Sequence, residues 1–240
     1  MQIPASSNTR IFSSFETLTL GSGPATVKQM ARTGKGGRSG WTQRRGEQRR
    51  DELMQAAEKL LESREIADIS LEDVARAAGI PVASAYHFYP DRQALFSALA
   101  ARISAGFLPI LSQPLPPRQR REWKAVLRAA IHRAARFYER HPAARKLLLD
   151  GKAPAEIRMA ERLRDKSVAL LVEGVYDSYF VLPAFIGRTE VFFHTVEIAD
   201  LIFQLSVMQH GRITPKMERH AFIASEAYLG RFLPERLPPR

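Results

Sequence analysis

The chain has 240 residues, of which 45% are hydrophobic, and its 36 Lys and Arg exceed its 25 Asp and Glu to give a net charge of +11. This length suits one small domain and one larger domain. The absence of cysteine excludes disulfides, thiolate zinc sites and cysteine nucleophiles. A basic excess of this size favours a partner that carries negative charge.

The first 41 residues are rich in Ser, Thr and Gly and show no hydrophobic period, so we expect a disordered basic tail over residues 1–41. Met30 begins a stretch that looks like a natural start. The residues before it are either an over-long gene prediction or an ordinary tail. Residues 31–50 carry seven Lys and Arg and one acid. Such a run is either a solvated tail or a footprint for phosphates, and the segment that follows favours phosphates.

No segment reads as an export signal or a membrane span. The first thirty residues lack a continuous apolar core and a basic start. The most apolar window, residues 191–208, contains His194, Glu197, Asp200 and Gln204. Charges at the middle of a membrane helix cost roughly 2.5–3.5 kcal/mol each. We therefore expect a cytoplasmic protein with no membrane partner.

The first predicted helix runs from Thr42 to Ser63. Its apolar residues fall at the spacing of one helical face: Leu53, Ala56, Ala57, Leu60 and Leu61. The opposite face is charged, so this helix is expected to pack on others with one side only.

Residues 70–99 predict three short helices with almost no linker. Ser70 can cap the first helix with its hydroxyl, and Gly79 stands where the chain must turn with positive φ. Pro81 pre-sets φ at the start of the second helix, which runs to about Phe88. Asp91 can cap the third helix.

The second of these helices is too short to be stable alone, so its neighbours must hold it and leave its other face free. Two short helices joined at a glycine turn, with the second presented outward, form a helix-turn-helix. The third helix is expected from Arg92 to about Ser104.

The sequence carries Leu-Glu-Asp-Val-Ala, then Ala-Gly-Ile, then Ser-Ala-Tyr-His-Phe-Tyr-Pro-Asp-Arg-Gln-Ala-Leu. Over about residues 47–104 this pattern resembles the DNA-binding domain of the tetracycline-repressor (TetR) family. The resemblance implies a dimeric, all-helical, ligand-responsive transcription regulator. Pro81, Val82 and Ala85 depart from the commonest form of the pattern, which affects the detail of the base and phosphate contacts rather than the fold.

The resemblance also implies roles for individual residues in this sequence. Val82, Ala83 and Ser84 would face the major groove, Tyr86 and His87 would contact phosphates, and Phe88 and Tyr89 would pack inward. Tyr86 could instead be a core residue and His87 merely solvated. The predicted DNA-binding set is Arg44, Arg45, Ser70, Val82, Ala83, Ser84, Tyr86, His87 and Arg92.

Beyond this domain, Pro109, Pro114, Pro116 and Pro117 predict a break in the helical pattern. Further helical patterns follow. They cover residues 122–141, 142–149, 154–180, 189–210 and 214–233, with Thr189 and Thr214 as caps. We therefore expect an all-α protein with a helix-turn-helix domain at residues 42–106 and a helical ligand-binding and dimerisation domain at residues 107–236.

Aromatic residues of the second domain are either plain core or the lining of a ligand cavity. The candidates for lining are Trp123, Phe137, Tyr138, Tyr176, Phe180, Phe193 and His194. His194, Glu197 and Gln204 share one face of an apolar helix, where they could bond a ligand or lie at a dimer seam. The family dimerises through its last two long helices, which favours the seam.

No GxSxG, HExxH or phosphate-cradling glycine loop is present, and the six histidines lack acidic partners at ligand spacing. We therefore expect no enzyme activity, no metal and no cofactor. The predicted function is a repressor released from a palindromic operator by a small apolar or aromatic ligand. It would act as a homodimer in the cytoplasm, associated with the nucleoid when bound to DNA. The alternative is an architectural helix-turn-helix protein that binds DNA without a ligand.

Overall fold

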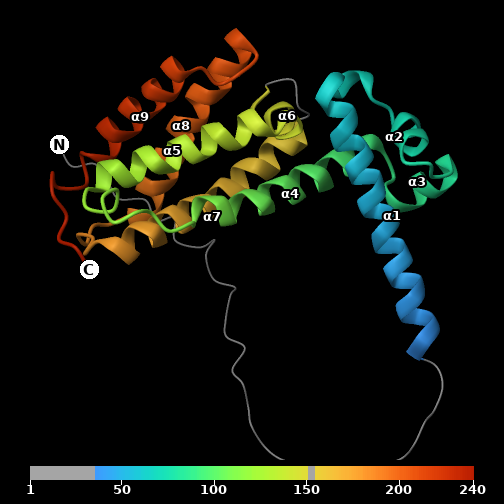
Figure 1. Ribbon diagram of the computed structural model, residues 1–240, viewed down its shortest axis with the longest axis horizontal. Helices are drawn as coiled ribbons and strands as arrows, with labels where there is room; N and C mark the ends of the chain where they lie inside the picture. The colour runs from blue at the N-terminus through green and yellow to red at the C-terminus, as the bar shows by residue number, and fades with distance from the viewer. Residues whose placement is uncertain (1–35, 151–154) are drawn as a thin grey trace, which may run out of the picture.

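The computed structural model describes residues 36–150 and 155–240 of the chain. In this part of the chain the regular elements are helices, joined by short loops (Figure 1). They are α1 (Gly36–Ser63), η1 (Ile66–Asp68), α2 (Leu71–Ala77), α3 (Val82–Phe88), α4 (Arg92–Leu111), α5 (Trp123–Arg140), α6 (Pro142–Ala144), η2 (Arg145–Leu149), α7 (Ala155–Tyr179), α8 (Arg188–His210) and α9 (Pro215–Leu229). The all-α prediction is confirmed; within the described ranges only an isolated bridge joins Phe180 to Pro239.

The predicted caps and turn of the helix-turn-helix are confirmed. Ser70 accepts a hydrogen bond from the Asp73 N–H at 3.0 Å, and the Asp73 carboxylate accepts one from the Ser70 N–H at 3.1 Å, which completes a capping box. Gly79 turns the chain with φ 66°, and the Asp91 carboxylate accepts the Ala94 N–H at 2.7 Å. These contacts satisfy backbone donors that a short helix would otherwise leave open.

The small domain closes over one apolar core. Leu53, Ala57 and Leu61, part of the predicted stripe of α1, are completely buried, as are Ala85 of α3 and Leu95 of α4. Seven-residue helices such as α2 and α3 are held by this burial and not by intrinsic propensity. Residues 151–154 and 1–35 lie outside the described residues, so the expectation of a disordered tail concerns mostly that part of the chain.

Several helix boundaries differ from the prediction, among them the end of α9, which is Leu229 and not residue 233. Helix α1 begins at Gly36 and not at Thr42. Helix α4 continues to Leu111, past the predicted end near Ser104, with Pro109 inside it. Pro109 falls in the last turn, where its missing N–H removes only one bond, while the buried side chains of Phe107 and Leu111 hold that turn in place. The expectation that the break begins at Pro109 was therefore wrong.

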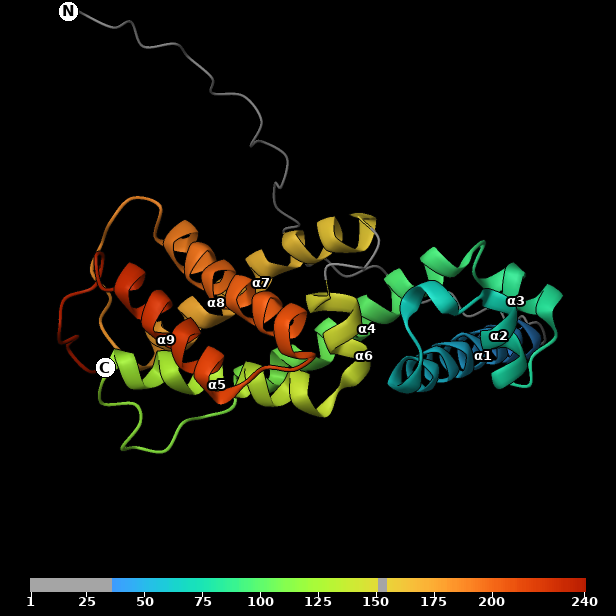
Figure 2. The same cartoon turned by 90° about the horizontal axis from the view of Figure 1, so that it is seen from above.

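Because α4 is continuous, one helix belongs to both halves of the molecule (Figure 1). Residues 106 and 107, where the two predicted domains meet, lie within this helix. Its first turns pack under α1, and its later turns pack against α5 and α7. Seen from above, α1–α3 lie at one end of α4 and the long helices α5 and α7–α9 at the other (Figure 2). Helix α4 is therefore a direct structural connection between the two domains.

The start of α8 is another correction. Thr189 does not cap this helix; Gly187, with φ 74°, occupies the capping position. The Thr189 hydroxyl instead donates to the buried carboxylate of Glu173 at 2.7 Å, and the Arg188 guanidinium binds the same carboxylate at 2.6 Å. The Thr189 hydroxyl, predicted to cap α8, is therefore used in the contact with α7. Thr214, by contrast, caps α9 as predicted, accepting the Met217 N–H at 3.2 Å.

Helices α4 and α8 are long and apolar enough, by length and composition, to cross a membrane. In this fold α4 contributes a row of buried residues to both domains, and α8 packs between α7 and α9. Their apolar character is therefore accounted for by helix packing within a globular molecule.

Candidate nucleic-acid interface and ligand cavity

Helix α3 is attached by one face and open on the other. Ala85 is fully buried and Tyr89, which follows the helix, is 7% exposed, as expected for an inward residue. Val82 and Tyr86 are 41% and 44% exposed, and Ala83 and His87 are exposed as well. The predicted groove-facing residues thus lie on the free face, with Ser84 half-buried at its edge. A short helix presented in this way can enter a major groove.

Tyr86 is neither a core residue nor a free hydroxyl. Its phenol donates a short hydrogen bond to the carboxylate of Glu72 on α2. This bond lowers the pKa of Glu72 and raises the pKa of Tyr86. A phosphate oxygen would have to compete with Glu72 for the same donor.

The arginines of α1 border the same face. Arg44 and Arg45, both predicted, are exposed, and Arg49 lies one turn further along the helix. The Arg49 side chain borders two surface hollows, one beside the Gly79 turn and one beside Ser84 and His87 on α3. Sequence reasoning missed Arg49, although its spacing of four residues from Arg45 places both on one helical face.

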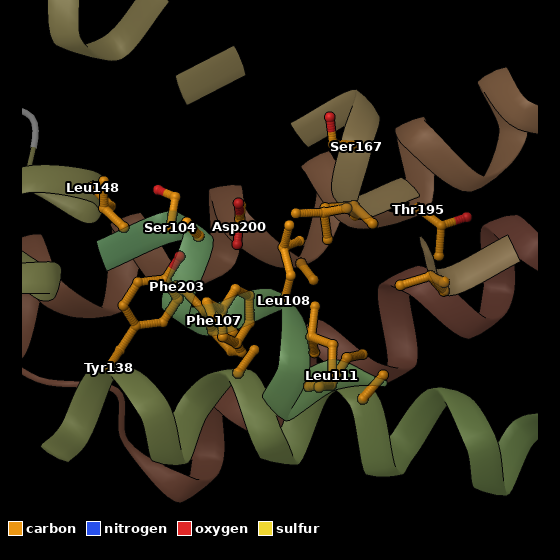
Figure 3. A pocket seen from close by; sticks show the side chains of 18 of the residues that line it. Ser104, Phe107, Leu108, Leu111, Tyr138, Leu148, Ser167, Thr195, Asp200 and Phe203 are labelled. Carbon is orange, nitrogen blue, oxygen red and sulfur yellow. The ribbon is translucent and has the colours of Figure 1, made fainter. Parts of the chain in front are cut away.

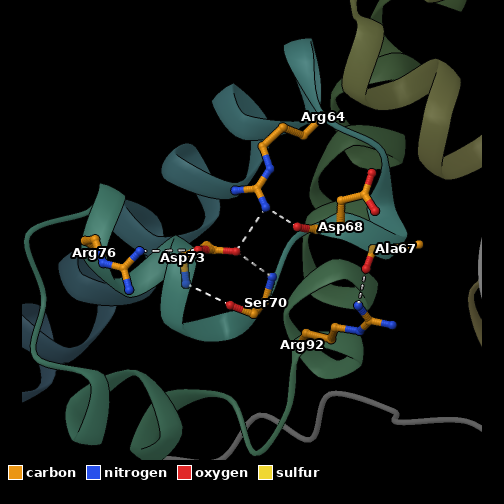
Figure 4. A network of polar contacts seen from close by, with 7 residues as sticks. All are labelled: Arg64, Ala67, Asp68, Ser70, Asp73, Arg76 and Arg92. Carbon is orange, nitrogen blue, oxygen red and sulfur yellow. Dashed lines mark hydrogen bonds and ion pairs between the residues drawn. The ribbon is translucent and has the colours of Figure 1, made fainter.

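Two predicted DNA-binding residues have structural partners in the protein. The Arg92 guanidinium donates to the carbonyl oxygen of Ala67 at 2.9 Å. The Ser70 hydroxyl is engaged in the cap of α2. Figure 4 shows Ser70 in a polar network around Asp73, which also takes an ion pair from Arg64 at 3.1 Å, and it shows the bond from Arg92 to Ala67 as a separate contact.

That network reaches the second domain through Lys146 of η2. The Lys146 ammonium donates to the carbonyl oxygen of Arg64 at 2.8 Å and pairs with the Glu65 carboxylate at 3.3 Å. Two residues further along, Leu148 lines an apolar cavity of the second domain. A π-helical segment therefore connects a cavity wall to the residues that cap α2.

The cavity lies between α4, α5, α7 and α8 and has a volume of about 220 Å³. Its walls are mostly aliphatic and aromatic side chains, among them Phe107, Leu108, Leu111, Tyr138 and Phe203 (Figure 3). Polar atoms enter the lining from Ser104, Ser167, Thr195 and Asp200. An apolar pocket with a few polar groups is the usual form of a small-molecule site.

Of the aromatic residues proposed to line a cavity, Tyr138 is the one that lines this cavity. Trp123 is buried elsewhere, with its indole N–H donating to the Pro234 carbonyl oxygen at 2.9 Å. Tyr176 is fully buried with its hydroxyl on the Trp123 carbonyl oxygen at 3.0 Å, and burial raises its pKa. The other four, Phe137, Phe180, Phe193 and His194, are also absent from the cavity wall.

His194 lies on the outer side of α8 and contacts the Tyr228 hydroxyl of α9 at 2.9 Å. The same side of α8 continues with the exposed apolar residues Leu201, Leu205 and Met208, and α9 adds Ile223, which is 53% exposed. Exposed apolar residues at successive helical turns mark a surface suited to another protein chain. In the described residues no group of acidic, histidine or cysteine side chains could hold a metal ion.

The described residues combine a helix-turn-helix domain that has a basic first helix with a helical domain that has an apolar cavity. One long helix joins the two, and the first domain has the form of a DNA-binding module. Residues 53–99 match the sequence profile of bacterial regulatory proteins, tetR family. The DNA-binding domain of this chain is therefore similar to that of the TetR family, as its helix-turn-helix motif indicated.

Characterised relatives share mainly the first domain. The HTH-type transcriptional regulator EthR of Mycobacterium tuberculosis (strain ATCC 25618 / H37Rv) is 38% identical over 58 residues, which are 24% of this chain and 27% of that protein. EthR of Mycolicibacterium smegmatis is 29% identical over 123 residues, 49% of this chain and 53% of that protein. The chain thus matches about half or less of the length of these relatives. Their names agree with the prediction that the chain is not an enzyme.

Solved structures extend the likeness to the whole fold. A TetR-family transcriptional regulator from Streptomyces coelicolor superimposes with a TM-score of 0.59 at 20% identity, over 77% of this chain and 99% of that chain. A TetR transcriptional regulator from Rhodococcus sp. RHA1 gives 0.56 at 18% identity, over 78% and 97%. The architecture of two helical domains is therefore shared where the sequence has diverged.

Proposed function

We propose that the chain is a cytoplasmic transcriptional regulator that binds duplex DNA as a homodimer and is released by a small molecule in the cavity between α4, α5, α7 and α8. The observation that carries this proposal is the free face of α3, where Val82, Ala83 and Tyr86 are exposed beside the arginines of α1. The exposed side chains of α3 would meet base edges, and the arginines of α1 would neutralise phosphates.

Dimerisation is assigned to the outer faces of α8 and α9. Leu201, Leu205, Met208 and Ile223 expose apolar surface that a second copy would cover in a four-helix arrangement. Two recognition helices related by a two-fold axis read a palindromic operator with half-sites about 34–36 Å apart, or a related distance.

Ligand control would act through differential affinity, because a ligand shifts the two states only by as much as it prefers one of them. Two structural links can carry that shift from the cavity to α3. One is α4, which lines the cavity and enters the small domain. The other is Lys146, which ties η2 to the end of α1.

An architectural protein that binds DNA without a ligand is the second candidate. The apolar cavity of about 220 Å³ favours the ligand-controlled regulator, because DNA packaging needs no such cavity. Anisotropy titrations of labelled duplex over a range of salt test the DNA-binding part. The logarithm of the affinity should fall linearly with the logarithm of the salt concentration. A salt-independent affinity would remove the basis of the proposal.

A further inference from the structure

The cavity has two chemically different ends. Ser104 of α4 and Asp200 of α8 lie toward the same side in Figure 3, with Tyr138 and Leu148, whereas Leu111 and Thr195 lie on the other side. Helix geometry agrees with this view, since Leu111 is about two turns along α4 from Ser104 and Thr195 is more than one turn along α8 from Asp200. Helix α4 therefore runs from the polar end of the cavity to the apolar end, and α8 runs in the opposite direction.

The far end offers a ligand little besides apolar contact. The Thr195 hydroxyl already donates to the Val191 carbonyl oxygen of its own helix at 2.7 Å. The aliphatic side chain of Leu111 lies at the same end (Figure 3). A polar ligand group placed here would lose its hydration without a new donor, which is costly.

The polar end carries a carboxylate. Asp200 is the acidic residue among the cavity-lining residues, and it also has an interaction within the protein. An ionised carboxylate only accepts hydrogen bonds, but its two oxygens offer about four acceptor sites, so it can serve a ligand beside a protein partner. The group it would recognise is a hydrogen-bond donor, and the group it would repel is an anion.

The volume limits the size of the ligand. An apolar cavity of about 150 Å³ lined by Leu, Ile and Phe binds benzene. The cavity of about 220 Å³ in this protein is somewhat larger and therefore suits one substituted ring.

We propose that the cavity takes an uncharged, alkyl-substituted single-ring compound with one hydroxyl group, such as an alkylphenol. Its hydroxyl donates to the Asp200 carboxylate, with the Ser104 hydroxyl near the same end, and its alkyl group lies against Leu108 and Leu111. This inference rests on the proposed function, because it assigns the chemistry of the same effector cavity. It adds that carboxylic acids of the same shape are rejected by Asp200.

Three probes of matched shape test the assignment by calorimetry on the full chain without DNA. They are 4-isopropylphenol, isopropylbenzene and 4-isopropylbenzoate. The phenol should bind about tenfold more tightly than the hydrocarbon, which is the ratio expected for one hydrogen bond to a charged acceptor. The benzoate should show no binding. Equal affinity for phenol and hydrocarbon, or tighter binding of the benzoate, would overturn the proposal.

Variants assign the effect to Asp200. Asp200→Ala should keep the affinity for isopropylbenzene and bring the phenol down to it. Asp200→Asn keeps the size and an acceptor oxygen, so it should still prefer the phenol over the hydrocarbon while losing the rejection of the benzoate. Ser167→Ala, at another part of the cavity wall, is the matched control and should leave all three affinities unchanged. A phenol preference that survives in Asp200→Ala would contradict the assignment.

Ligand chemistry and ligand control of DNA binding can be told apart by their outcomes. If 4-isopropylphenol binds as expected but operator-bound protein is not released, the ligand chemistry stands and ligand control of DNA binding is wrong. If none of the three probes binds to a chain that still binds DNA, the ligand chemistry is wrong and the DNA-binding function stands.

Discussion

The Tyr86 hydroxyl of the recognition helix α3 donates to the Glu72 carboxylate of α2, at the surface that is proposed to meet DNA. A carboxylate in this position both holds the phenol ring in place and repels phosphate. DNA binding would replace the Glu72 acceptor with a phosphate oxygen, so part of the free energy of the new contact is offset by the bond that is lost.

Removing each partner in turn tests this exchange. Tyr86→Phe should weaken binding to all duplexes alike by roughly 0.5–1.5 kcal/mol, the net value of one hydrogen bond. Glu72→Gln should strengthen binding, because it removes a negative charge beside the phosphates. Anisotropy titrations with specific and random duplexes measure both. Unchanged affinity in Tyr86→Phe would mean that the hydroxyl stays on Glu72 in the complex.

The cap of α2 predicts a measurable effect on stability. Ser70→Ala removes the hydroxyl that accepts the Asp73 N–H, and loss of such a cap typically costs about 1 kcal/mol of unfolding free energy. Ser63→Ala, at an exposed serine at the end of α1, is the control and should be neutral. Urea denaturation of both variants gives the comparison. Equal stability of the two would show that the capping box contributes nothing.

The same cap has a pH signature. Hydrogen bonds from the backbone N–H of Ser70 and from its side chain lower the pKa of Asp73 below the ordinary value of 3.8. A lowered folded-state pKa adds stability that is complete above the unfolded pKa and is lost as the pH falls through the folded value. The stability gap between the natural chain and Asp73→Asn should therefore narrow as the pH is lowered from about 5 to about 3. A gap that stays constant over this range would contradict the assigned cause.

Lys146 is expected to hold the small domain against the large one. Lys146→Met removes both the bond to the Arg64 carbonyl oxygen and the pair with Glu65. Amide hydrogen exchange in α2 and α3 should speed up by an amount equivalent to about 1 kcal/mol, because local opening no longer breaks that contact. Lys59→Met, at an exposed lysine of α1, is the control. Identical exchange in the two variants would show that the Lys146 contacts do not hold the small domain in place.

The dimer seam is best tested at Leu201, which is 56% exposed in the protomer. Leu201→Arg places a charge at the proposed seam without touching the core of one chain, so it should give a monomer by light scattering. Phe193→Arg is a poorer probe, because Phe193 packs against the core of its own chain. Ile186→Arg, at a fully exposed apolar residue outside α8, is the control and should stay dimeric. A dimeric Leu201→Arg would place the interface elsewhere.

The helix-turn-helix could be predicted in detail because its signals are local. Ser70, Gly79 and Asp91 each act on backbone groups within a few residues, and the structure has all three in the expected roles. The end of α4 could not be predicted in this way. Whether Pro109 ends the helix depends on the packing of Phe107 and Leu111, which sequence does not give.

The cavity was the least predictable feature. Its position depends on how four helices pack, so aromatic spacing alone selected Trp123 and Tyr176, which are core residues. The residues that line it are mostly small or aliphatic and carry no distinct signal. Asp200 was visible in the sequence as a charge in an apolar helix, but only packing shows that it faces the cavity.

Selection of duplexes from a random pool, followed by sequencing, tests the central claim most directly. The natural chain should enrich one palindromic sequence, whose half-sites are about one helical turn apart or at a related distance. A chain with Ala83→Asp, which adds a negative charge to the free face of α3, should enrich nothing. A pool that stays random with the natural chain, or the same palindrome enriched by Ala83→Asp, would contradict the claim that α3 reads DNA.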